Sequence, residues 1–462
     1  MECGPRCLIW TLRSGKIRWK SSTTRAIASL SPRLVAREPS RDEQSSRRAS
    51  PIPAQALAED DTRSPLERFR TQRKRPMSVT DIVSPAWCEL QYFYNLSKYG
   101  RVQQTPAMRQ GSSVHKVLEE EVHVAVPVEV LTREDGFGLR IWNVIQGLRT
   151  LRTTGLTREF EVWGVVEGQV VNGVIDELSY TCPDPALEAA LQSRKKPGRP
   201  KKQKEAELPV NQTTLSNFFS DKGASTLKDT LSASQNDALA PISAKKVYIT
   251  DIKTRSSRSV PKDEVALRPT YMQLMIYRRL LSQLASDSVT ADQIFARYHV
   301  DGEAIFSDVF ISQIGGLDQP LQPPTSSYGS DADSDYAPNT QDSLTELLAH
   351  NNLSKLWTLM IAEIGAAIPD IGAMLRAEFR AAASGDVMGS KVFLNDERRL
   401  DGYVRDEMAW WKGDRAARGV DIEEAFKCRI CSFADGCEWR KEKVEEGLRK
   451  AKTKEAGKKS EV

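Results

Sequence analysis

The stretch KKVYITDIKTR, residues 245 to 255, places an acid and a base two positions apart among apolar and β-branched residues. Its alternating apolar side chains predict a short β-strand. Asp251 and Lys253 then project from one face of that strand, because side chains two apart point the same way. For an acid and a base placed in this way, a solvated pair on the protein surface is the ordinary outcome. The meaning of this pair therefore depends on the segments around it.

The neighbouring segments predict a mixed α/β fold. Before the strand, REFEVWGVVEGQVVNGVIDELSY (residues 158 to 180) alternates apolar and polar residues around a Glu-Gly pair, which predicts a β-hairpin. After the strand, RPTYMQLMIYRRLLSQL (residues 268 to 284) has helical spacing. Residues 78 to 100, which begin with a capping serine, and residues 111 to 126 also read as helices.

Asp176 lies near the end of the second hairpin strand, where it could converge on Asp251 and Lys253. Two carboxylates with an open position between them suit Mg²⁺, which prefers oxygen ligands and keeps several waters. A lysine beside such an ion can orient or deprotonate an attacking water. The triplet therefore suggests metal-assisted hydrolysis of a phosphodiester.

Two predicted helices carry further candidates at helical spacing. His115 stands four residues before Glu119 and so shares its face, and Gln273 and Tyr277 are also four apart. The ordinary alternatives are a packed or solvated histidine and a polar helix surface.

In this order, the motifs resemble those of the exonuclease V family, in the RecB-like branch of the PD-(D/E)xK nucleases. The four motifs are G-x-x-x-H at Gly111 to His115, G-x-x-D at Gly173 to Asp176, D-x-K at Asp251 to Lys253, and Q-x-x-x-Y at Gln273 to Tyr277. The resemblance covers about residues 78–182 and 246–445. It implies a restriction-endonuclease-like α/β core, with a central mixed sheet flanked by helices and two disordered insertions.

The resemblance also implies roles for individual residues. The implied catalytic set is His115, Asp176, Asp251, Lys253, Gln273 and Tyr277. The first three would bind Mg²⁺, or Mn²⁺ in its place, with the carbonyl of Ile252 completing the shell. Lys253 would activate or position water, and the last two would hold the motif or contact the DNA. Asp251 stands where many relatives have glutamate.

Cysteines form a second candidate site. CRICSFADGCEWR (residues 428 to 440) spaces three of the seven cysteines as C-x2-C-x5-C, one thiolate short of a four-ligand site. An odd, bunched set indicates a reduced compartment and a metal site. Cys88, at the start of the core, is the fourth ligand we favour. Four thiolates suit zinc or an iron–sulfur cluster, and the spacing does not choose. The resemblance implies a structural [4Fe–4S] cluster on Cys88, Cys428, Cys431 and Cys437 that clasps the two ends of the core.

The resemblance implies single-stranded DNA as the substrate, degraded from a free end into short oligonucleotides, with 5′ ends favoured in fungal-type members. Basic residues beside the metal site could contact phosphates, or could be plain surface charge. The candidates are Lys98, Arg101, Arg109, Arg255 and Arg258. Trp410 and Trp411 are either core residues or platforms for unpaired bases.

The composition and termini suggest where the chain is folded. With 462 residues, 40% of them hydrophobic, a net charge of +4 and a mean hydropathy of −0.46, part of the chain should lie outside any core. No apolar run approaches the roughly 20 residues that cross a bilayer, so we expect a soluble protein. The expected segments are a mitochondrial leader at 1–40, a disordered linker at 41–77, core parts at 78–183 and 245–315, disordered insertions at 184–244 and 316–345, a helical C-terminal part at 346–445 and a charged tail at 446–462. A basic disordered terminus is the alternative to the leader.

The first insertion carries two short motifs. RKKPGRPKKQK (residues 194 to 204) could be a nuclear localisation signal, an arm for a DNA minor groove or a solvated charge run. Eight residues later, Gln212, Leu215, Phe218 and Phe219 resemble the peptide box that docks on the replication sliding clamp. These motifs suggest a nuclear pool beside a mitochondrial one, with the clamp and single-strand-binding protein as partners of a monomer.

We therefore expect an Mg²⁺-dependent exonuclease acting on single-stranded DNA in replication, recombination and repair. A flap-cutting or endonucleolytic enzyme of the same fold is the nearest alternative. A non-catalytic, metal-stabilised DNA-binding scaffold is the alternative from another class, although a scaffold has no need of the D-x-K motif.

Overall fold

The structure is a computed structural model, which describes residues 31–37, 61–71, 75–100, 104–195, 245–257, 259–316 and 343–460. Its centre is a six-stranded mixed sheet in the order β2-β5-β6-β7-β8, with β4 also paired to β5. The strands are β2 (Met77–Ser78), β4 (Leu156–Val166), β5 (Gln169–Ser179), β6 (Lys246–Arg255), β7 (Asp370–Ala381) and β8 (Val387–Leu394). Strands β4–β5, β5–β6 and β7–β8 pair antiparallel, whereas β2–β5 and β6–β7 are parallel.

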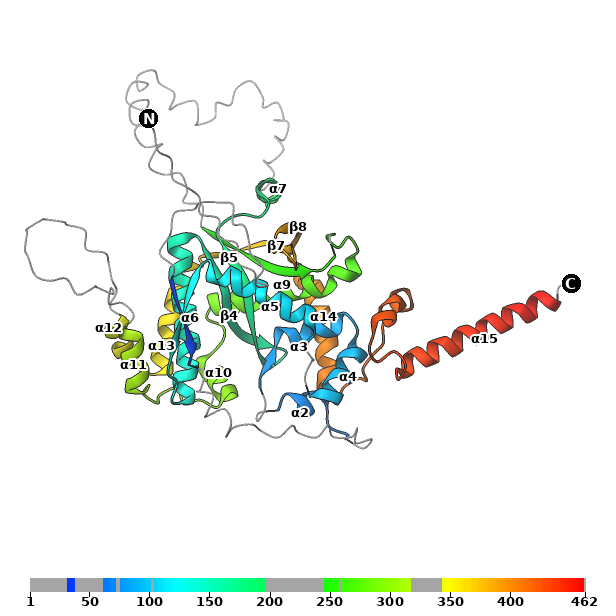
Figure 1. Cartoon of the computed structure of the whole chain (residues 1–462), viewed down its shortest axis with the longest axis horizontal. Helices are drawn as coiled ribbons and strands as arrows, with labels where there is room; N and C mark the ends of the chain where they lie inside the picture. Colours follow the sequence, from blue (N-terminus) through cyan, green and yellow to red (C-terminus); the bar gives the residue numbers. More distant parts are fainter. Residues whose placement is uncertain are drawn as a thin grey trace, which may run out of the picture.

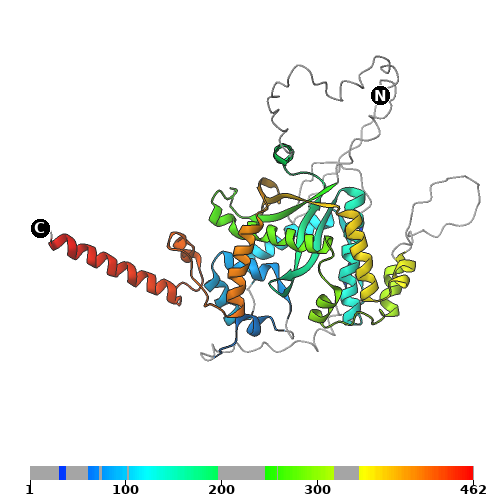
Figure 2. The same ribbon diagram turned by 180° about the vertical axis from the view of Figure 1, so that it is seen from behind.

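Helices flank this sheet, as the α/β prediction requires (Figure 1). The larger ones are α5 (Pro106–Glu120), α6 (Arg133–Thr154), α9 (Glu264–Ala285), α13 (Leu353–Ala367) and α14 (Glu397–Lys412). Helices α6 and α13 run side by side, which is also clear from behind (Figure 2), and α6 and α9 both pack on β4. The sheet and these helices enclose one large apolar core. Among the described residues, none of the helices has the length and apolar character to cross a membrane.

The predicted hairpin is confirmed. Strands β4 and β5 are joined at Glu167 and Gly168, whose φ angles of 48° and 80° form the left-handed two-residue turn that suits the twist of a hairpin. The strand at 246–255 and the helix that follows it are confirmed as β6 and α9.

Two predicted helices were wrong in part. The helix expected over 78–100 is broken at Pro85, which lacks an amide hydrogen, into α3 (Val79–Val83), a 3-10 turn η1 (Ser84–Ala86) and α4 (Glu89–Tyr99). The helix expected over 111–126 ends at Glu120. The residues after it form strand β3 (His123–Val128), because their alternating valines pair with another strand.

The limits expected for the unstructured segments also need correction. The stretch assigned to the leader contains strand β1 (Ser31–Ala36), which pairs parallel with β3. The linker contains α2 (Pro65–Phe69), where Ser64 and Glu67 form a capping box and Phe69 is buried. Helix α7 (Pro185–Lys195) occupies the start of the first insertion.

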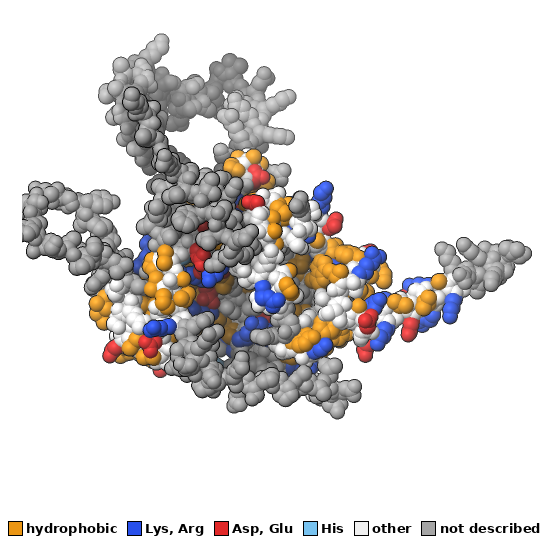
Figure 3. Space-filling model, viewed as in Figure 1, with side chains coloured by type: hydrophobic (Ala, Val, Ile, Leu, Met, Phe, Trp, Pro, Cys, Tyr) orange, Lys and Arg blue, Asp and Glu red, His pale blue; other side chains and the backbone are white. Residues whose placement is uncertain are grey.

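The remaining helices lie mainly toward the C-terminal half. They are α10 (Ala291–Tyr298), α11 (Asp308–Gly315), α12 (Ser343–Ala349), the 3-10 segment η4 (Ile422–Ile430) and α15 (Glu438–Ser460). The predicted charged tail therefore belongs to α15, which projects away from the sheet (Figure 1). Acidic and basic side chains both line this helix (Figure 3), so it has no apolar face comparable to those of the core helices.

Candidate active site

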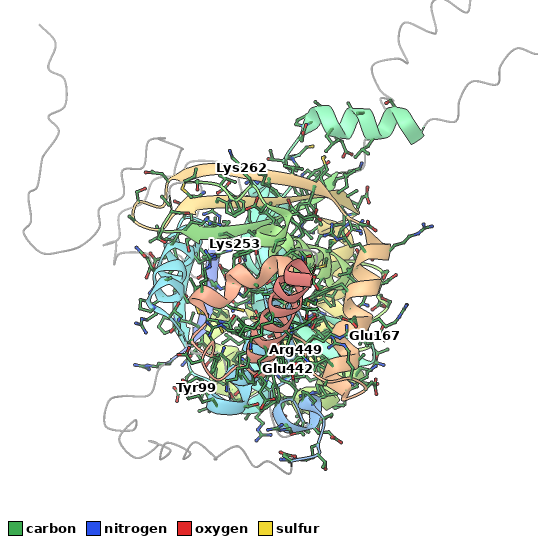
Figure 4. All side chains as sticks on the ribbon, turned by 90° about the vertical axis from the view of Figure 1, so that its right-hand side faces the viewer. Tyr99, Glu167, Lys253, Lys262, Glu442 and Arg449 are labelled. Atoms are coloured by element: carbon green, nitrogen blue, oxygen red, sulfur yellow. The ribbon has the colours of Figure 1, made fainter. Side chains whose placement is uncertain are left out.

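A cavity of about 810 Å³ is lined by residues of α5, of the β1–β3 pair and of β6. Its lining includes His115, Asp176, Lys253 and Gln273, which come from four different elements. Lys253 projects from β6 and is labelled in Figure 4. The four sequence motifs therefore meet around one cavity, as predicted.

The D-x-K pair lies as the strand prediction requires. The Lys253 ammonium donates to Asp251 Oδ1 over 2.9 Å and to Gln273 Oε1 over 2.8 Å. The Gln273 amide in turn donates to the Tyr277 hydroxyl over 3.0 Å. The glutamine and tyrosine on α9 thus hold the lysine in place. Burial opposes the charge of Lys253, but Asp251 and Asp176 outweigh that effect and raise its pKa.

Asp176 joins this group from β5. Its Oδ2 accepts a hydrogen bond of 2.6 Å from the backbone amide of Ile252, which fixes the carboxylate against β6. His115 approaches from α5, with Nδ1 3.6 Å from Asp176 Oδ1 and Nε2 3.1 Å from the Ile252 carbonyl oxygen. Imidazole, carboxylate and main-chain carbonyl are therefore adjacent, as the family resemblance implied.

Glu159 completes the group, and the sequence reasoning missed it. Its Oε1 lies 3.2 Å from His115 Nδ1, and ligand atoms of His115, Glu159 and Asp176 all lie within 4.8 Å of one another. The position of Glu159 in the predicted hairpin could have indicated that it lies near Asp176. Glu159 lies eight residues before the turn and Asp176 eight residues after it, so a regular hairpin would bring the two acids together, and their carboxylate oxygens do lie close. Like charges opposed across a hairpin are destabilising unless something neutralises them.

The electrostatics of the group favour a cation. Burial, and then the nearby charge of Asp251, raise the pKa of Asp176 to about 7. Asp251 is fully buried, and its Oδ2 has no hydrogen-bond partner among the described residues. An unpartnered buried carboxylate oxygen is costly, and a metal ion is a usual partner for one. Three carboxylates and an imidazole are a donor set that fits a divalent ion.

Comparison with known proteins identifies the family. The model of a family described as exonuclease V, a 5′ deoxyribonuclease, matches residues 64–440. This chain belongs to the exonuclease V family. It is 27% identical to exonuclease V of Danio rerio, over 82% of this chain and 73% of that protein. It is 24% identical to the mitochondrial exonuclease V of Eremothecium gossypii (80% of this chain, 77% of that protein) and 23% identical to that of Candida glabrata (80% of each).

This exonuclease V family member is therefore a DNA exonuclease, a hydrolase of phosphodiester bonds. The cavity with its acidic group, histidine and lysine is the part of the described structure whose side chains suit that reaction.

The exonuclease also brings its four predicted cluster cysteines together. Cys88, Cys428, Cys431 and Cys437 line one small pocket, although one of them comes from a distant part of the sequence. Burial raises the pKa of the Cys88 thiol, and the other three add to the shift. Cys182 lies elsewhere, beside Tyr248.

Ionic contacts hold the two sides of this pocket together. The buried Lys427 ammonium donates to the Trp87 carbonyl over 2.8 Å and to Glu424 over 2.6 Å, and it also lies 4.5 Å from the centre of the Trp87 ring. Arg415 pairs with Glu89 at 2.7 Å. These contacts fix the residues on either side of Cys88 against the C-terminal segment.

The predicted DNA contacts differ in their exposure and in where they lie relative to the cavity. Trp410 and Trp411 are 1% and 0% exposed and pack around Tyr92, so they are core residues, and the alternative that they stack on unpaired bases is wrong. Their helix turns both rings inward because residues of α14 at helical spacing face the core. Lys98 is exposed and lies 6.0 Å from the centre of the Phe433 ring, on the segment between Cys431 and Cys437, and it is not part of the cavity lining.

The remaining predicted basic contacts are exposed, half-buried or outside the described residues. Arg109 is exposed on α5, and Arg255 is half-buried and donates to Ser257. Arg101, Arg258 and the clamp-type box at 212–219 lie outside the described residues. The cavity instead presents two cations that the sequence reasoning did not single out, Arg33 and Lys116.

Proposed function

We propose that this exonuclease degrades single-stranded DNA from the 5′ end with Mg²⁺ bound at the cavity. The proposed ligands are Glu159, Asp176, Asp251 and His115. The observation that carries this assignment is the buried, unpartnered Oδ2 of Asp251, whose charge acts on Asp176 of the His115, Glu159 and Asp176 group. Mn²⁺ would be accepted as well, because carboxylate and imidazole ligands suit both ions.

The bound ion would polarise the scissile phosphodiester and lower the pKa of a nucleophilic water. Lys253 supplies a fixed positive charge beside the acids. Its ammonium has three N–H donors, and Asp251 and Gln273 accept two of them. The third is available for a phosphate oxygen or a water in the cavity. Gln273 and Tyr277 orient the ammonium, which is the kind of preorganisation that stabilises developing charge.

The preference for one strand and for a free end follows from the family resemblance and from the shape of the site. The reactive group lies in a cavity whose lining includes residues of α5 and of the β1–β3 pair. A single strand can bring its backbone to such a recessed group more easily than a duplex can. The family description as a 5′ deoxyribonuclease supports the polarity.

The four cysteines would hold a [4Fe–4S] cluster. Four thiolates suit either zinc or an iron–sulfur cluster. The family resemblance, with one cysteine before the nuclease motifs and three after them, supports the cluster, and the four cysteines line one pocket. Such a group would tie α4 to the C-terminal segment and act structurally.

The proposed cellular setting follows from the names of the relatives and from the basic segments of this chain. The relatives from Eremothecium gossypii and Candida glabrata are named mitochondrial, and the basic N-terminal composition of this chain agrees with that location. The basic stretch at 194–204 and the clamp-type box would add a nuclear pool, with the sliding clamp and single-strand-binding protein as partners. Replication, recombination and repair would supply single-stranded ends.

Digestion of labelled DNA tests the proposal. Linear single strands with a free or blocked 5′ end, circles and duplexes are incubated with Mg²⁺ and wild type or Asp251→Asn. Wild type should cut only the linear strands with a free 5′ end, and the isosteric variant should lose activity. Cutting of circles would favour an endonuclease. Full activity of Asp251→Asn would remove the proposed site.

A further inference from the structure

Strand β1 lies at the active site although residues 31–36 precede the stretch that the family model covers. It pairs parallel with β3, with Ser31 opposite His123 and Ala36 opposite Val128. Arg33 and Val35 line the same cavity as the acidic group. This N-terminal strand is therefore part of the cavity wall.

The strand is held in place by contacts that do not involve Arg33. Leu34 is 2% exposed, its amide donates to Asn143 Oδ1, and its carbonyl accepts from Asn143 Nδ2, each over 2.8 Å. Ser31 Oγ lies 2.6 Å from His123 Nδ1. Loss of the Arg33 side chain should therefore leave β1 docked.

The guanidinium of Arg33 reaches the backbone behind the acidic group. Its Nη1 donates to the Glu159 carbonyl over 2.9 Å and more weakly to the Arg158 carbonyl over 3.4 Å. Its Nε lies 2.6 Å from Glu119 Oε1 on α5. One side chain thus links β1 to β4 and α5, the elements that carry Glu159 and His115.

The backbone that Arg33 contacts is unusual. Glu159 has φ 50°, in the left-handed region that few side chains other than glycine adopt readily. Arg158 pairs with Glu177 and Phe160 with Ile175, but the pair between them is missing from the ladder. Such an outlier persists only where its surroundings enforce it, and it marks candidate functional positions.

We propose that Arg33 is a positioning residue for the metal site, which holds the Glu159 backbone so that the carboxylate faces His115 and Asp176. The proposal rests on the proposed function, since it takes the acidic group as a metal site. Arg33 contacts the carbonyl of Glu159 and not its carboxylate, so it acts through Glu159. Groups that orient a metal ligand typically change metal affinity about 10–100-fold when they are removed.

Mn²⁺ binding by the full-length chain, followed by electron paramagnetic resonance, tests this role without relying on turnover. The variants are Arg33→Gln and Arg33→Lys. Arg37→Gln is the matched control, because Arg37 is exposed and directly follows the same strand. Arg33→Gln should bind Mn²⁺ about 10-fold more weakly. Arg33→Lys should show a smaller loss than Arg33→Gln, because it keeps the positive charge beside Glu119 although one ammonium cannot also bridge both carbonyls. Arg37→Gln should bind as wild type does.

The outcomes separate this inference from the proposed function. Unchanged Mn²⁺ affinity in Arg33→Gln, beside a clear loss in Asp176→Asn, would overturn the positioning role and leave the metal site standing. Weaker binding of single-stranded DNA without metal, at unchanged Mn²⁺ affinity, would make Arg33 a phosphate contact and also overturn it. Absence of a Mn²⁺ site in wild type would remove both proposals. Thermal unfolding of each variant checks folding, and Arg33→Lys decides if Arg33→Gln does not fold.

Discussion

A β-carbon on Gly173 would lie 2.6 Å from Cε1 of Tyr277, so the tyrosine ring packs directly on the backbone of β5. The same β-carbon would lie 2.7 Å from Val79 Cγ2, so it could not move away from the tyrosine ring without meeting the valine. The lack of a side chain at the glycine of the G-x-x-D motif therefore leaves the space that the tyrosine ring of the Q-x-x-x-Y motif occupies. That tyrosine accepts from Gln273, which in turn holds Lys253.

Substitution of Gly173 should thus disturb the lysine from a distance. Gly173→Ala is expected to lower the rate of single-strand degradation about 10–100-fold, because displacements of about 1 Å in a site can cost that much. Gly365→Ala is the control, since a β-carbon there meets nothing within 4 Å. Initial rates on labelled DNA provide the measurement. A rate within twofold of wild type for Gly173→Ala would show that the tyrosine can move without consequence.

Glu159 should behave as a ligand. Glu159→Gln is expected to weaken Mg²⁺ binding and to raise the Mg²⁺ concentration for half-maximal rate at least about 10-fold, the lower end of the effect expected for groups around a metal. Glu120→Gln serves as control, because Glu120 lines the same cavity, is exposed and stands outside the ligand group. Equal Mg²⁺ requirements in the two variants would show that Glu159 acts only through its negative charge and not as a ligand.

His123 should make the attachment of β1 sensitive to pH. Burial, and then the nearby Arg33, lower the pKa of His123 to about 4 from its ordinary 6.5. A depressed histidine pKa means that the folded state excludes a proton which the unfolded state accepts. The resulting stability is present above pH 6.5 and is lost as the pH falls toward 4, up to about 3 kcal/mol.

Thermal unfolding between pH 4 and 8 measures this effect. The midpoint of wild type should fall more steeply below pH 6.5 than that of His123→Asn, which cannot take up a proton. His299→Asn, at an exposed position with φ 56° that asparagine tolerates, should follow wild type. Parallel curves for wild type and His123→Asn would contradict the assignment.

The cysteine pocket predicts a matched pair of substitutions. Cys88→Ser should remove most of the iron and the visible colour of anaerobically prepared protein and lower its unfolding temperature, because metal binding and folding are coupled in such sites. Cys182→Ser should change neither, since Cys182 lies beside Tyr248 instead. Iron, sulfide and zinc analysis provides the measurement. If the protein contained stoichiometric zinc and no iron, the four cysteines would be assigned as a zinc site and not as a cluster site.

The position of β1 constrains any processing of the N-terminal segment. If a leader is removed in mitochondria, the mature chain should begin before Ser31, because removal of β1 would expose β3 and take Arg33 from the cavity. Mass spectrometry of the mature N-terminus checks this. A mature chain that begins after Arg37 and retains full Mn²⁺ affinity would show that β1 is dispensable.

Local chemistry explains which features could be predicted from the sequence. The Glu167–Gly168 turn and the alternation around it define the hairpin, and the two-residue spacing of Asp251 and Lys253 places them on one face. Pro85 could have been recognised as a helix break. The burial of Trp410 and Trp411 could not, because a half-polar helix can face either the core or a substrate.

The sequence by itself determined the family, the motifs and their order, and the acids on the strands, because periodicity and turn chemistry act between near neighbours. Only the tertiary structure decided that Glu159 faces His115 at 3.2 Å and that Cys88 shares a pocket with Cys428, Cys431 and Cys437. It also placed Arg33 against the Glu159 carbonyl, across 126 positions of the chain. Contacts at such separations depend on how the whole core packs, which no local pattern encodes.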